Sequence, residues 1–455
     1  MTSPSSHSSP MSWSTLLSDK RFGLEHYHDI KAGVRSDFQR DFDRLVFSSP
    51  FRRLQNKTQV FPLPGSIFVH NRLTHSMEVA CVGRSMATEI SLRLRDKYRD
   101  DPRADNLGSM GDIVAAACLA HDMGNPPFGH SGEKAISSYF SEGAGSKFRD
   151  SLSPAEWADL THFEGNANAF RLLTHRFNGR RNGGFAMTYS TLASIVKYPY
   201  ESLLAGKKGK FGFFSSERES FTRVADELGL LKLSAEGEPL RYARHPLVFI
   251  VEAADDICYE IMDIEDAHKL GILPTREVIP LLLGYFTPER QEHINKVMNH
   301  VDDPNEKIAY LRSCIIGSLV EACAETFVAH EEEILAGTFS GPLVKHIPAL
   351  EKGAYEACEA LSWSKIYCAP DVVELELAGT RIISFLIDEL VKAVTEPHLN
   401  YSRLLLSKVP QQYETDAPGL YGKLQAVLDH ISGMTDVYAL DLYRRLNGMS
   451  LKINN

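Results

Sequence analysis

The sequence has no pair of cysteines at the spacing of a zinc or redox site. Its seven cysteines occur singly, and most fall in apolar helical patterns. They indicate reduced thiols inside a cytoplasmic protein rather than a disulfide framework. No apolar run approaches the roughly 20 residues needed to span a bilayer, and the first residues lack the basic flank and apolar segment of a secretory signal. We therefore expect a cytoplasmic protein without a membrane partner.

The sequence also lacks an excess of positive charge. It carries 49 Lys and Arg against 59 Asp and Glu, a net charge of −10, and its pI is near 6.0. This balance argues against a general nucleic-acid-binding surface. An anionic substrate would have to be met by a local cluster of cations or by a metal ion.

Internal repeats and runs of alternating strands are absent as well. Apolar residues instead recur at helical spacing along most of the chain, and at most one short hairpin is expected, near Leu230–Tyr242. The sequence thus predicts an all-α fold. We expect a disordered Ser/Pro-rich tail over residues 1–20, a main helical bundle over 21–275, and a C-terminal helical region over 276–455 that packs on it.

One stretch, DIVAAACLAHDMGNPPFGHSGE at 112–133, organises the rest. Six of the seven residues from 113 to 119 are Ile, Val, Ala or Leu, which predicts a helix buried nearly all round. The helix ends at His121-Asp122, where Gly124 and two prolines stop it. A buried helix that ends in an aspartate must pair or coordinate that charge. His130 and Glu133 follow three residues apart on one face of the next helix.

Two other predicted helices carry possible partners for this pair. The helix Arg72–Tyr98 has His75 in its first turn, and Pro246–Leu270 repeats Asp255, Tyr259 and Asp263 every four residues on one face. His75, His121, Asp122 and Asp255 together offer two imidazoles and two carboxylates. Such a mixed set suits a divalent cation with open positions for water and a substrate oxygen.

The order of these residues resembles that of HD-domain metal phosphohydrolases. Longer segments resemble the deoxyguanosinetriphosphate triphosphohydrolase family within that superfamily, and the similarity runs over roughly residues 20–450. The segments are FRRLQNKTQVFP at 51–62, NRLTHSMEV at 71–79, HDMGNPPFGHSGE at 121–133, HFEGNANAFR at 162–171, EAADDICYEIMDIEDA at 252–267 and MTDVYALDLYRRL at 434–446.

The resemblance implies that His75, His121, Asp122 and Asp255 are the metal ligands, with Mg, Mn or Co as the expected metal. Asp255 is preferred over Asp256 because it shares a helical face with Tyr259, whereas Asp256 points about 100° away. The alternative, with Asp256 as the ligand and Asp255 behind it, stays open.

Catalytic and substrate-binding roles follow from the same resemblance. The expected catalytic residues are His130, Glu133 and His162, because breaking a phosphoester needs proton transfer by an oriented histidine. Glu133 is placed to orient either histidine. The expected substrate-binding residues are the phosphate cations Arg72 and Lys197, the neighbouring Tyr198, Gln59 and Val60 at the nucleobase and sugar, Tyr259 under the deoxyribose, and Asp263 at the 3′-hydroxyl.

The resemblance predicts an HD phosphohydrolase core over residues 21–275. It predicts metal-dependent hydrolysis of a deoxynucleoside triphosphate, dGTP preferred, to the deoxynucleoside and tripolyphosphate. Two alternatives remain: an HD-type nucleotidase or phosphodiesterase of other specificity, and a non-catalytic nucleotide-binding regulator. The family also suggests a homo-oligomer, such as a hexamer, and a single-stranded DNA or deoxynucleotide effector.

Overall fold

The computed structural model describes residues 9–27, 34–61, 69–101 and 106–449. Most of these residues form helices, and the extended segments between them pair only as isolated bridges. The segment expected to form a hairpin does fold back on itself, with Lys232 bridged to Tyr242, but it forms no strand. The prediction of an all-α fold is confirmed. None of the described helices is both long and apolar enough to cross a membrane.

The α-helices in chain order are α1 (Trp13–Leu16), α2 (Asp37–Val46), α3 (Ser49–Arg53), α4 (Arg72–Lys97), α5 (Met110–Ala120), α6 (Gly129–Ser141), α7 (Pro154–Thr161), α8 (Gly165–Thr174), α9 (Tyr189–Ser194), α10 (Arg218–Leu228), α11 (Pro246–Lys269), α12 (Thr275–Leu283), α13 (Pro288–Met298), α14 (Pro304–Ala329), α15 (Glu331–Leu335), α16 (Ala349–Leu361), α17 (Pro370–Thr395), α18 (Asn400–Leu406), α19 (Leu420–Ser432) and α20 (Asp436–Leu446). Short segments that bear on the site are the 3₁₀ turns η2 (Leu54–Asn56) and η5 (Ala144–Ser151) and the π-helical η10 (Ser362–Ile366).

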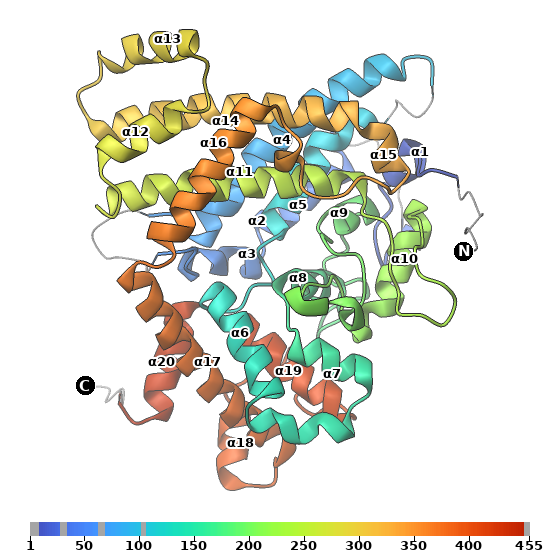
Figure 1. The fold of residues 1–455 in the computed structure, drawn as a ribbon. Coiled ribbons are helices and arrows are strands. Elements are labelled where there is room, and N and C mark those ends of the chain that lie inside the picture. The colour runs from blue at the N-terminus through green and yellow to red at the C-terminus, as the bar shows by residue number, and fades with distance from the viewer. Residues whose placement is uncertain (1–8, 28–33, 62–68, 102–105, 450–455) are drawn as a thin grey trace, which may run out of the picture.

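Helix α5 lies at the centre of one group of helices. Every residue of α5 except Asp112 is buried, as the apolar run predicted, because α2, α4, α9 and α11 pack around it. Helix α14 covers α4 and α11 on the far side (Figure 1). The N-terminus of α4 is fixed by a capping box. The Asn71 side chain accepts from the backbone N–H of Thr74, and the Thr74 hydroxyl accepts from the backbone N–H of Asn71.

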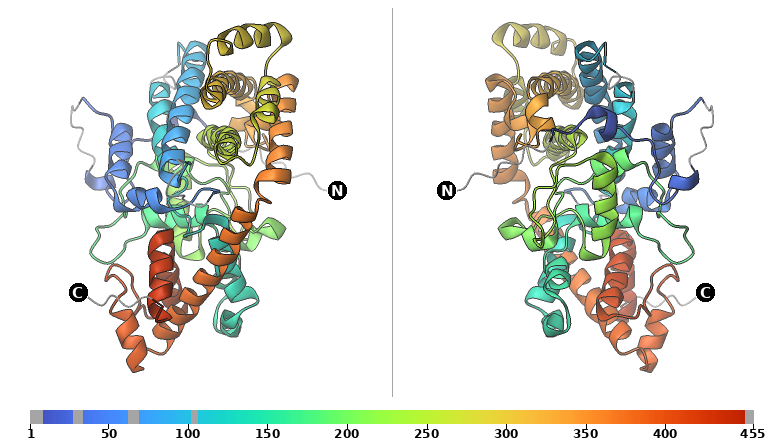
Figure 2. Two further views of the ribbon diagram at one scale, coloured as in Figure 1. Left: turned by 90° about the vertical axis from the view of Figure 1, so that its left-hand side faces the viewer. Right: turned by 90° about the vertical axis from the view of Figure 1, so that its right-hand side faces the viewer.

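A second group of helices is organised around α17. Helix α17 packs on α6, α18, α19 and α20, and its buried face includes Ile383, Leu386 and Leu390. Figure 2 shows α17 running from the first group down into the second. The second hydrophobic cluster therefore joins residues from 135 to 214 with residues from 382 to 442. Apolar packing thus crosses residue 275, and the domain boundary expected there stays a prediction.

The N-terminal segment differs from the disordered tail expected over residues 1–20. Residues 1–8 lie outside the described residues. Beyond them, Trp13 and Leu16 of α1 are buried, and the Trp13 indole donates to Glu331 Oε1 at 2.7 Å. The expectation of disorder is wrong for this part, because large apolar side chains outweigh the flanking serines and prolines.

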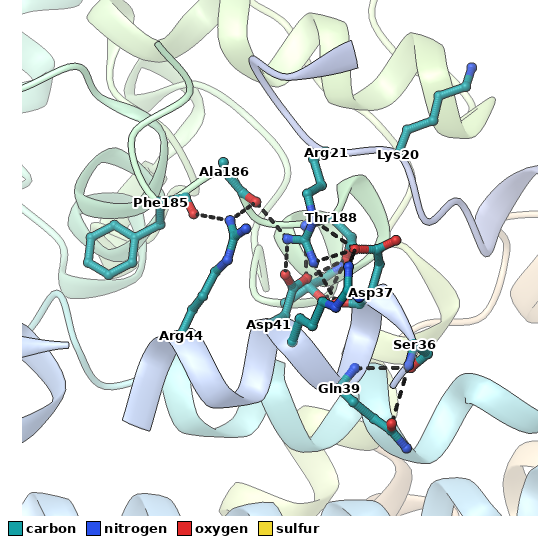
Figure 3. A network of polar contacts seen from close by, with 12 residues as sticks. Lys20, Arg21, Ser36, Asp37, Gln39, Asp41, Arg44, Phe185, Ala186 and Thr188 are labelled. Atoms are coloured by element: carbon teal, nitrogen blue, oxygen red, sulfur yellow. Dashed lines mark hydrogen bonds and ion pairs between the residues drawn. The ribbon is translucent and has the colours of Figure 1, made fainter. Parts of the chain in front are cut away.

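A buried polar network ties the next residues to the start of α9 (Figure 3). The Arg21 guanidinium donates to Asp37 and Asp41, and Asp41 Oδ2 accepts from both the backbone and the hydroxyl of Thr188. Arg44 donates to the carbonyl oxygen of Ala186. Because α9 leads directly to Lys197 and Tyr198, this network fixes one edge of the site described next.

Candidate active site

Three of the predicted ligands converge from three helices. His75 lies in the first turn of α4, His121 ends α5, and Asp255 lies in the middle of α11. Asp255 Oδ1 is 3.0 Å from His75 Nε2 and 3.5 Å from His121 Nε2. One ligand atom from each residue lies within 4.8 Å of the others. The structure therefore brings together side chains that are 180 positions apart in sequence.

The ring of His121 is held with its other nitrogen toward this cluster. His121 Nδ1 is 2.6 Å from the Cys118 carbonyl oxygen, which can only accept, so Nδ1 donates. His121 Nε2 is buried and has no hydrogen-bond partner. A backbone acceptor on one imidazole nitrogen, with a free lone pair on the other, is the usual arrangement of a metal-binding histidine.

Asp122 stands beside the cluster rather than in it. Its Oδ2 accepts from Arg72 at 2.7 Å, and its Oδ1 is 3.7 Å from His121 Nε2. The expectation that this buried aspartate must be paired is confirmed, and Arg72 is the partner. Its role as a fourth metal ligand stays a prediction.

The charges around His121 favour a cation at this position. Burial alone would lower the pKa of His121, but the Asp122 and Asp255 carboxylates raise it to about 9. Burial likewise opposes ionisation of Asp255, yet the two histidines hold its pKa well below the usual range. Carboxylates this close to an unpartnered imidazole nitrogen fit a divalent metal ion, which would replace the proton as the neutralising charge.

Asp256 does not belong to the cluster of His75, His121 and Asp255. It lines a separate cavity, and its backbone carbonyl accepts from the Tyr355 hydroxyl at 3.4 Å. Burial raises the pKa of Asp256 to about 7 despite the nearby Lys197 charge. The placement agrees with the helical-face argument for Asp255, and the ligand assignment itself stays a prediction.

Two cavities adjoin at the cluster. The inner chamber, of about 240 Å³, is lined by Gln59, Arg72, His121, Asp122, Asn125, His130, Glu133, Glu164, Asn166, Lys197, Tyr198, Lys210, Asp255 and Tyr259. The outer chamber, of about 470 Å³, is lined by Thr58, Gln59, Val60, Phe128, His130, Ser131, Lys134, Asp256, Tyr259, Glu260, Tyr355, Glu359, Trp363, Tyr367, Val372, Leu375 and Glu376. The two share Gln59, His130 and Tyr259, so these side chains stand at the junction.

His130 and Glu133 form the predicted pair on one helical face. His130 Nδ1 donates to Glu133 Oε2 at 2.8 Å, and Glu133 Oε1 accepts from the backbone of Gly165 at 2.7 Å. Burial opposes ionisation of Glu133, but the bond from His130 and the charge of Lys210 hold its pKa below the usual value. The carboxylate therefore orients the imidazole, whose Nε2 is left for another partner.

Cations line the inner chamber, each paired with a carboxylate. Lys197 Nζ is 3.3 Å from Glu252 Oε1, and Lys210 Nζ is 2.6 Å from Glu164 Oε1. Burial would lower the pKa of Lys197, but Glu252 raises it above the usual value. Lys210 is not among the residues predicted from the sequence, because a basic run such as KKGK at 207–210 is typical of a solvated loop. Its signal was the cluster of three lysines at one turn.

Tyr259 and Asp263, which were expected to contact the sugar, have different surroundings. Tyr259 stands between the chambers, with its ring centroid 6.5 Å from that of His75. Asp263 is buried and accepts from the Tyr367 hydroxyl at 2.9 Å. Because Asp263 lines neither chamber, it would reach a sugar only if Tyr367 moved.

His162 is placed outside both chambers. It ends α7, where its Nδ1 donates to the Ala158 carbonyl oxygen at 3.0 Å, and the next helix, α8, starts at Gly165. Its ring nevertheless lies near Gly209, next to Lys210. A catalytic role for His162 stays a prediction.

Two glycines explain how the motifs around residues 124 and 165 fit together. A Cβ atom on Gly124 would lie 2.1 Å from the Gly165 carbonyl oxygen, and one on Gly165 would lie 1.9 Å from Asn125 Oδ1. Either distance is far inside van der Waals contact. Only backbone without side chains can approach this closely, and the approach lets Glu133 accept from Gly165.

Comparisons with known proteins agree with this geometry. The HD domain family matches residues 72–190, which carry His75, His121 and Asp122, and the phosphohydrolase-associated domain family matches residues 352–445. The fold and the site are those of an HD-domain phosphohydrolase, a class of hydrolases that bind divalent metal ions.

Full-length relatives define the family more narrowly. The chain is 38% identical over 449 residues to a deoxyguanosinetriphosphate triphosphohydrolase-like protein of Pseudomonas aeruginosa, covering 97% of this chain and 99% of that one. A protein of the same description from Synechocystis is 38% identical over 458 residues, 97% of this chain and 100% of the relative. The deoxyguanosinetriphosphate triphosphohydrolase of Salmonella paratyphi A is 32% identical over 489 residues, with 90% and 93% covered. The chain belongs to the deoxyguanosinetriphosphate triphosphohydrolase family.

Proposed function

We propose that this protein hydrolyses deoxynucleoside triphosphates to the deoxynucleoside and tripolyphosphate, with dGTP preferred. The observation that carries the proposal is the junction of two unlike chambers beside the His75, His121 and Asp255 cluster. The inner chamber holds cations suited to phosphates, and the outer one holds aromatic rings suited to a base. A nucleotide that spans the junction would satisfy both.

The position of Tyr259 supports attack at the phosphorus nearest the sugar. Tyr259 lies one helical turn after Asp255 and separates the chambers. A sugar packed on Tyr259 therefore places the first phosphate against the cluster and the remaining phosphates deeper in the inner chamber. Cleavage there releases all three phosphates together. The same ring would crowd a 2′-hydroxyl group, which favours deoxyribose over ribose.

The residues of the inner chamber have three proposed roles: metal binding, phosphate binding and proton transfer. A divalent ion held by His75, His121, Asp122 and Asp255, for which we propose Mg, Mn or Co, would supply Lewis-acid stabilisation of phosphate charge. Arg72, Lys197 and Lys210 bind the phosphate oxygens; the lysines exchange their carboxylate partners for substrate. His130, oriented by Glu133, transfers a proton to or from the reacting oxygens.

The outer chamber supports the preference for guanine. Its wall includes the buried carboxylate of Glu260, which accepts from the Ser362 hydroxyl at 2.8 Å. Guanine presents adjacent N–H donors on its Watson–Crick edge, and a carboxylate accepts from both. Gln59 and Val60, which line the same chamber, contact the base and sugar.

Other properties extend this proposal. All seven cysteines are free, which supports a cytoplasmic location. A homo-oligomeric state and an effector site for single-stranded DNA or a deoxynucleotide stay predictions.

Product identity tests the proposed reaction. The purified protein is incubated with each deoxynucleoside triphosphate and with Mg²⁺, Mn²⁺ or Co²⁺, and tripolyphosphate is resolved from pyrophosphate and phosphate. We expect deoxyguanosine and intact tripolyphosphate in equal amounts, and dGTP turned over fastest. Release of pyrophosphate or phosphate as the first product would contradict the proposal, and nucleotide binding without turnover under every metal would favour a regulator.

A further inference from the structure

The C-terminal region contacts both walls of the site through one buried carboxylate. Asp436 is the first residue of α20 and is only 8% exposed. Its Oδ2 accepts from the backbone N–H of Thr58 at 2.8 Å, and its Oδ1 accepts from the backbone N–H of Phe128 at 3.0 Å. Each oxygen thus holds a different segment of the HD core.

The two segments held in this way lead directly into the chamber junction. Gln59 and Val60 follow Thr58, and His130 lies two residues after Phe128. Thr58 also bridges Asn71, whose neighbour Arg72 begins α4. Asp436 therefore holds two residues that line the outer chamber, Thr58 and Phe128, although it lines neither chamber itself.

Phe128 needs this support more than Thr58 does. Its φ is 62°, in the left-handed region that is strained for a residue with a side chain. It precedes α6 without a side-chain cap, so the bond from its N–H to Asp436 supports this turn together with the bond from the Gly129 N–H to the Pro126 carbonyl oxygen. Losing that acceptor would free the turn that carries His130.

Lys57 joins the same three segments by the opposite charge. Its ammonium group is buried and donates to the carbonyl oxygens of Asn125 at 2.5 Å and Ser432 at 2.7 Å. We define Lys57, Thr58, Phe128, Ser432 and Asp436 as the C-terminal junction. Both charged side chains of the junction, Lys57 and Asp436, are buried, and these contacts all end on backbone groups.

We propose that Asp436 is a positioning residue. Through the C-terminal junction it sets the distance between the segment that carries Gln59 and the segment that carries His130. The phosphohydrolase-associated region then helps to set the geometry of the site, in addition to packing against it. The kinetic part of the test rests on the proposed function, whereas the exchange part does not.

The test compares Asp436→Asn with two matched variants in the full chain. Asn keeps the shape but turns an amide N–H₂ toward one of the two N–H donors. Thr435→Ala removes the α20 cap, where Thr435 Oγ1 accepts from Tyr438 at 3.1 Å, and so controls for loss of helix stability. Asp441→Asn removes an exposed charge from the same helix, where Asp441 pairs with Arg445.

Hydrogen–deuterium exchange is followed at the Thr58 and Phe128 amides, together with bound metal, Tm and dGTP turnover. We expect Asp436→Asn alone to speed exchange at both amides. We also expect it to lower kcat/KM by 10-fold to about 100-fold, since a shift near 1 Å in a reacting group costs that much. Metal content stays unchanged. Lys57→Met, which keeps the buried stem, repeats the test from the other side of the junction if Asp436→Asn is insoluble.

A double-variant cycle separates positioning from general destabilisation. In a His130→Ala background, the fold-loss caused by Asp436→Asn should shrink, because part of it acts through His130. Equal fold-losses in both backgrounds, or losses in Thr435→Ala that match those in Asp436→Asn, would overturn the proposal, as would unchanged exchange at both amides. If the wild-type protein cleaves no deoxynucleoside triphosphate, the proposed function fails, and the exchange data still decide the role of Asp436.

Discussion

The inner and outer chambers meet at three side chains but are built from different parts of the chain. Every residue that lines the inner chamber lies between positions 59 and 259. The outer chamber adds a wall from η10 and helices α16 and α17, including Tyr355, Trp363 and Tyr367. The inner lining is dominated by ion pairs, and the outer by rings and carboxylates. The contrast agrees with the proposal that the phosphates are bound in the inner chamber and the base in the outer one, whose wall is completed by the C-terminal region.

The largest expected effect is a difference in bound metal between variants of two neighbouring aspartates, Asp255 in the inner chamber and Asp256 in the outer one. Asp255→Asn should remove the bound metal and reduce turnover of every nucleotide to background, because it loses the carboxylate between His75 and His121. Asp256→Asn should keep most of the metal. Metal analysis of the two purified variants checks this, and the reverse order would assign the ligand to Asp256.

Arg72→Ala tests whether the inner chamber acts on all bases alike. We expect kcat/KM to fall by about 10²-fold for dGTP and dATP together, from loss of a phosphate-binding cation. Metal-free protein should also lose stability, since the buried Asp122 carboxylate loses its 2.7 Å partner. Bound metal should recover part of that loss. Steady-state kinetics measure the loss of kcat/KM, and Tm with and without Mn²⁺ measures the loss of stability. A loss of kcat/KM that differs between dGTP and dATP would contradict a role for Arg72 in phosphate binding alone.

Glu260→Gln tests the outer chamber in the same way. It should reduce the preference for dGTP over dATP by about 10-fold, within the 1–3 kcal/mol that a good bidentate base contact supplies. The metal content and the turnover of dATP should stay near wild type. Competition between the two nucleotides in one reaction gives the ratio directly. Deoxyinosine triphosphate, which lacks the guanine amino group, should already show a reduced preference in the wild-type protein.

The smallest effect is a pH dependence of that ratio. Burial raises the pKa of Glu260 to about 7, partly offset by the hydrogen bond from Ser362. The carboxylate is therefore ionised above pH 7 and protonated below it, and only the ionised form accepts from both guanine donors. The preference for dGTP should be larger at pH 8 than at pH 6. Glu260→Gln should abolish this difference, and a pH dependence that survives in the variant would point to another group.

The two chambers also differ in how well the sequence predicted them. The ends of α5 and the pairing of His130 with Glu133 followed from local spacing, because helical periodicity and short motifs fix them. Tyr355 and Tyr367 gave no such signal, since rings at helical spacing look the same whether they pack in a core or line a cavity. The bond from Tyr367 to Asp263 gave no signal either, because the two residues are 104 positions apart, and the role of Asp263 at the sugar stays a prediction.

Lys210 shows the same limit inside the HD core. A basic run next to glycine looks like a solvated loop, and only tertiary structure shows that Glu164 draws this lysine into the inner chamber. The helix α7 was also missed, although Ser153, Pro154 and Glu156 form a capping box with proline at its start. Local sequence is sufficient to mark the start of α7, whereas the pairing of Lys210 with Glu164 depends on the tertiary fold.

The bonds from Asp436 to Thr58 and Phe128 join residues 378 and 308 positions apart. During synthesis, the metal-binding residues emerge from the ribosome long before α20 does. A nascent chain can therefore assemble its histidines and Asp255 while the turn before His130 still lacks its anchor. If the proposed hydrolysis depends on that anchor, the full rate would be reached only once translation has passed Asp436.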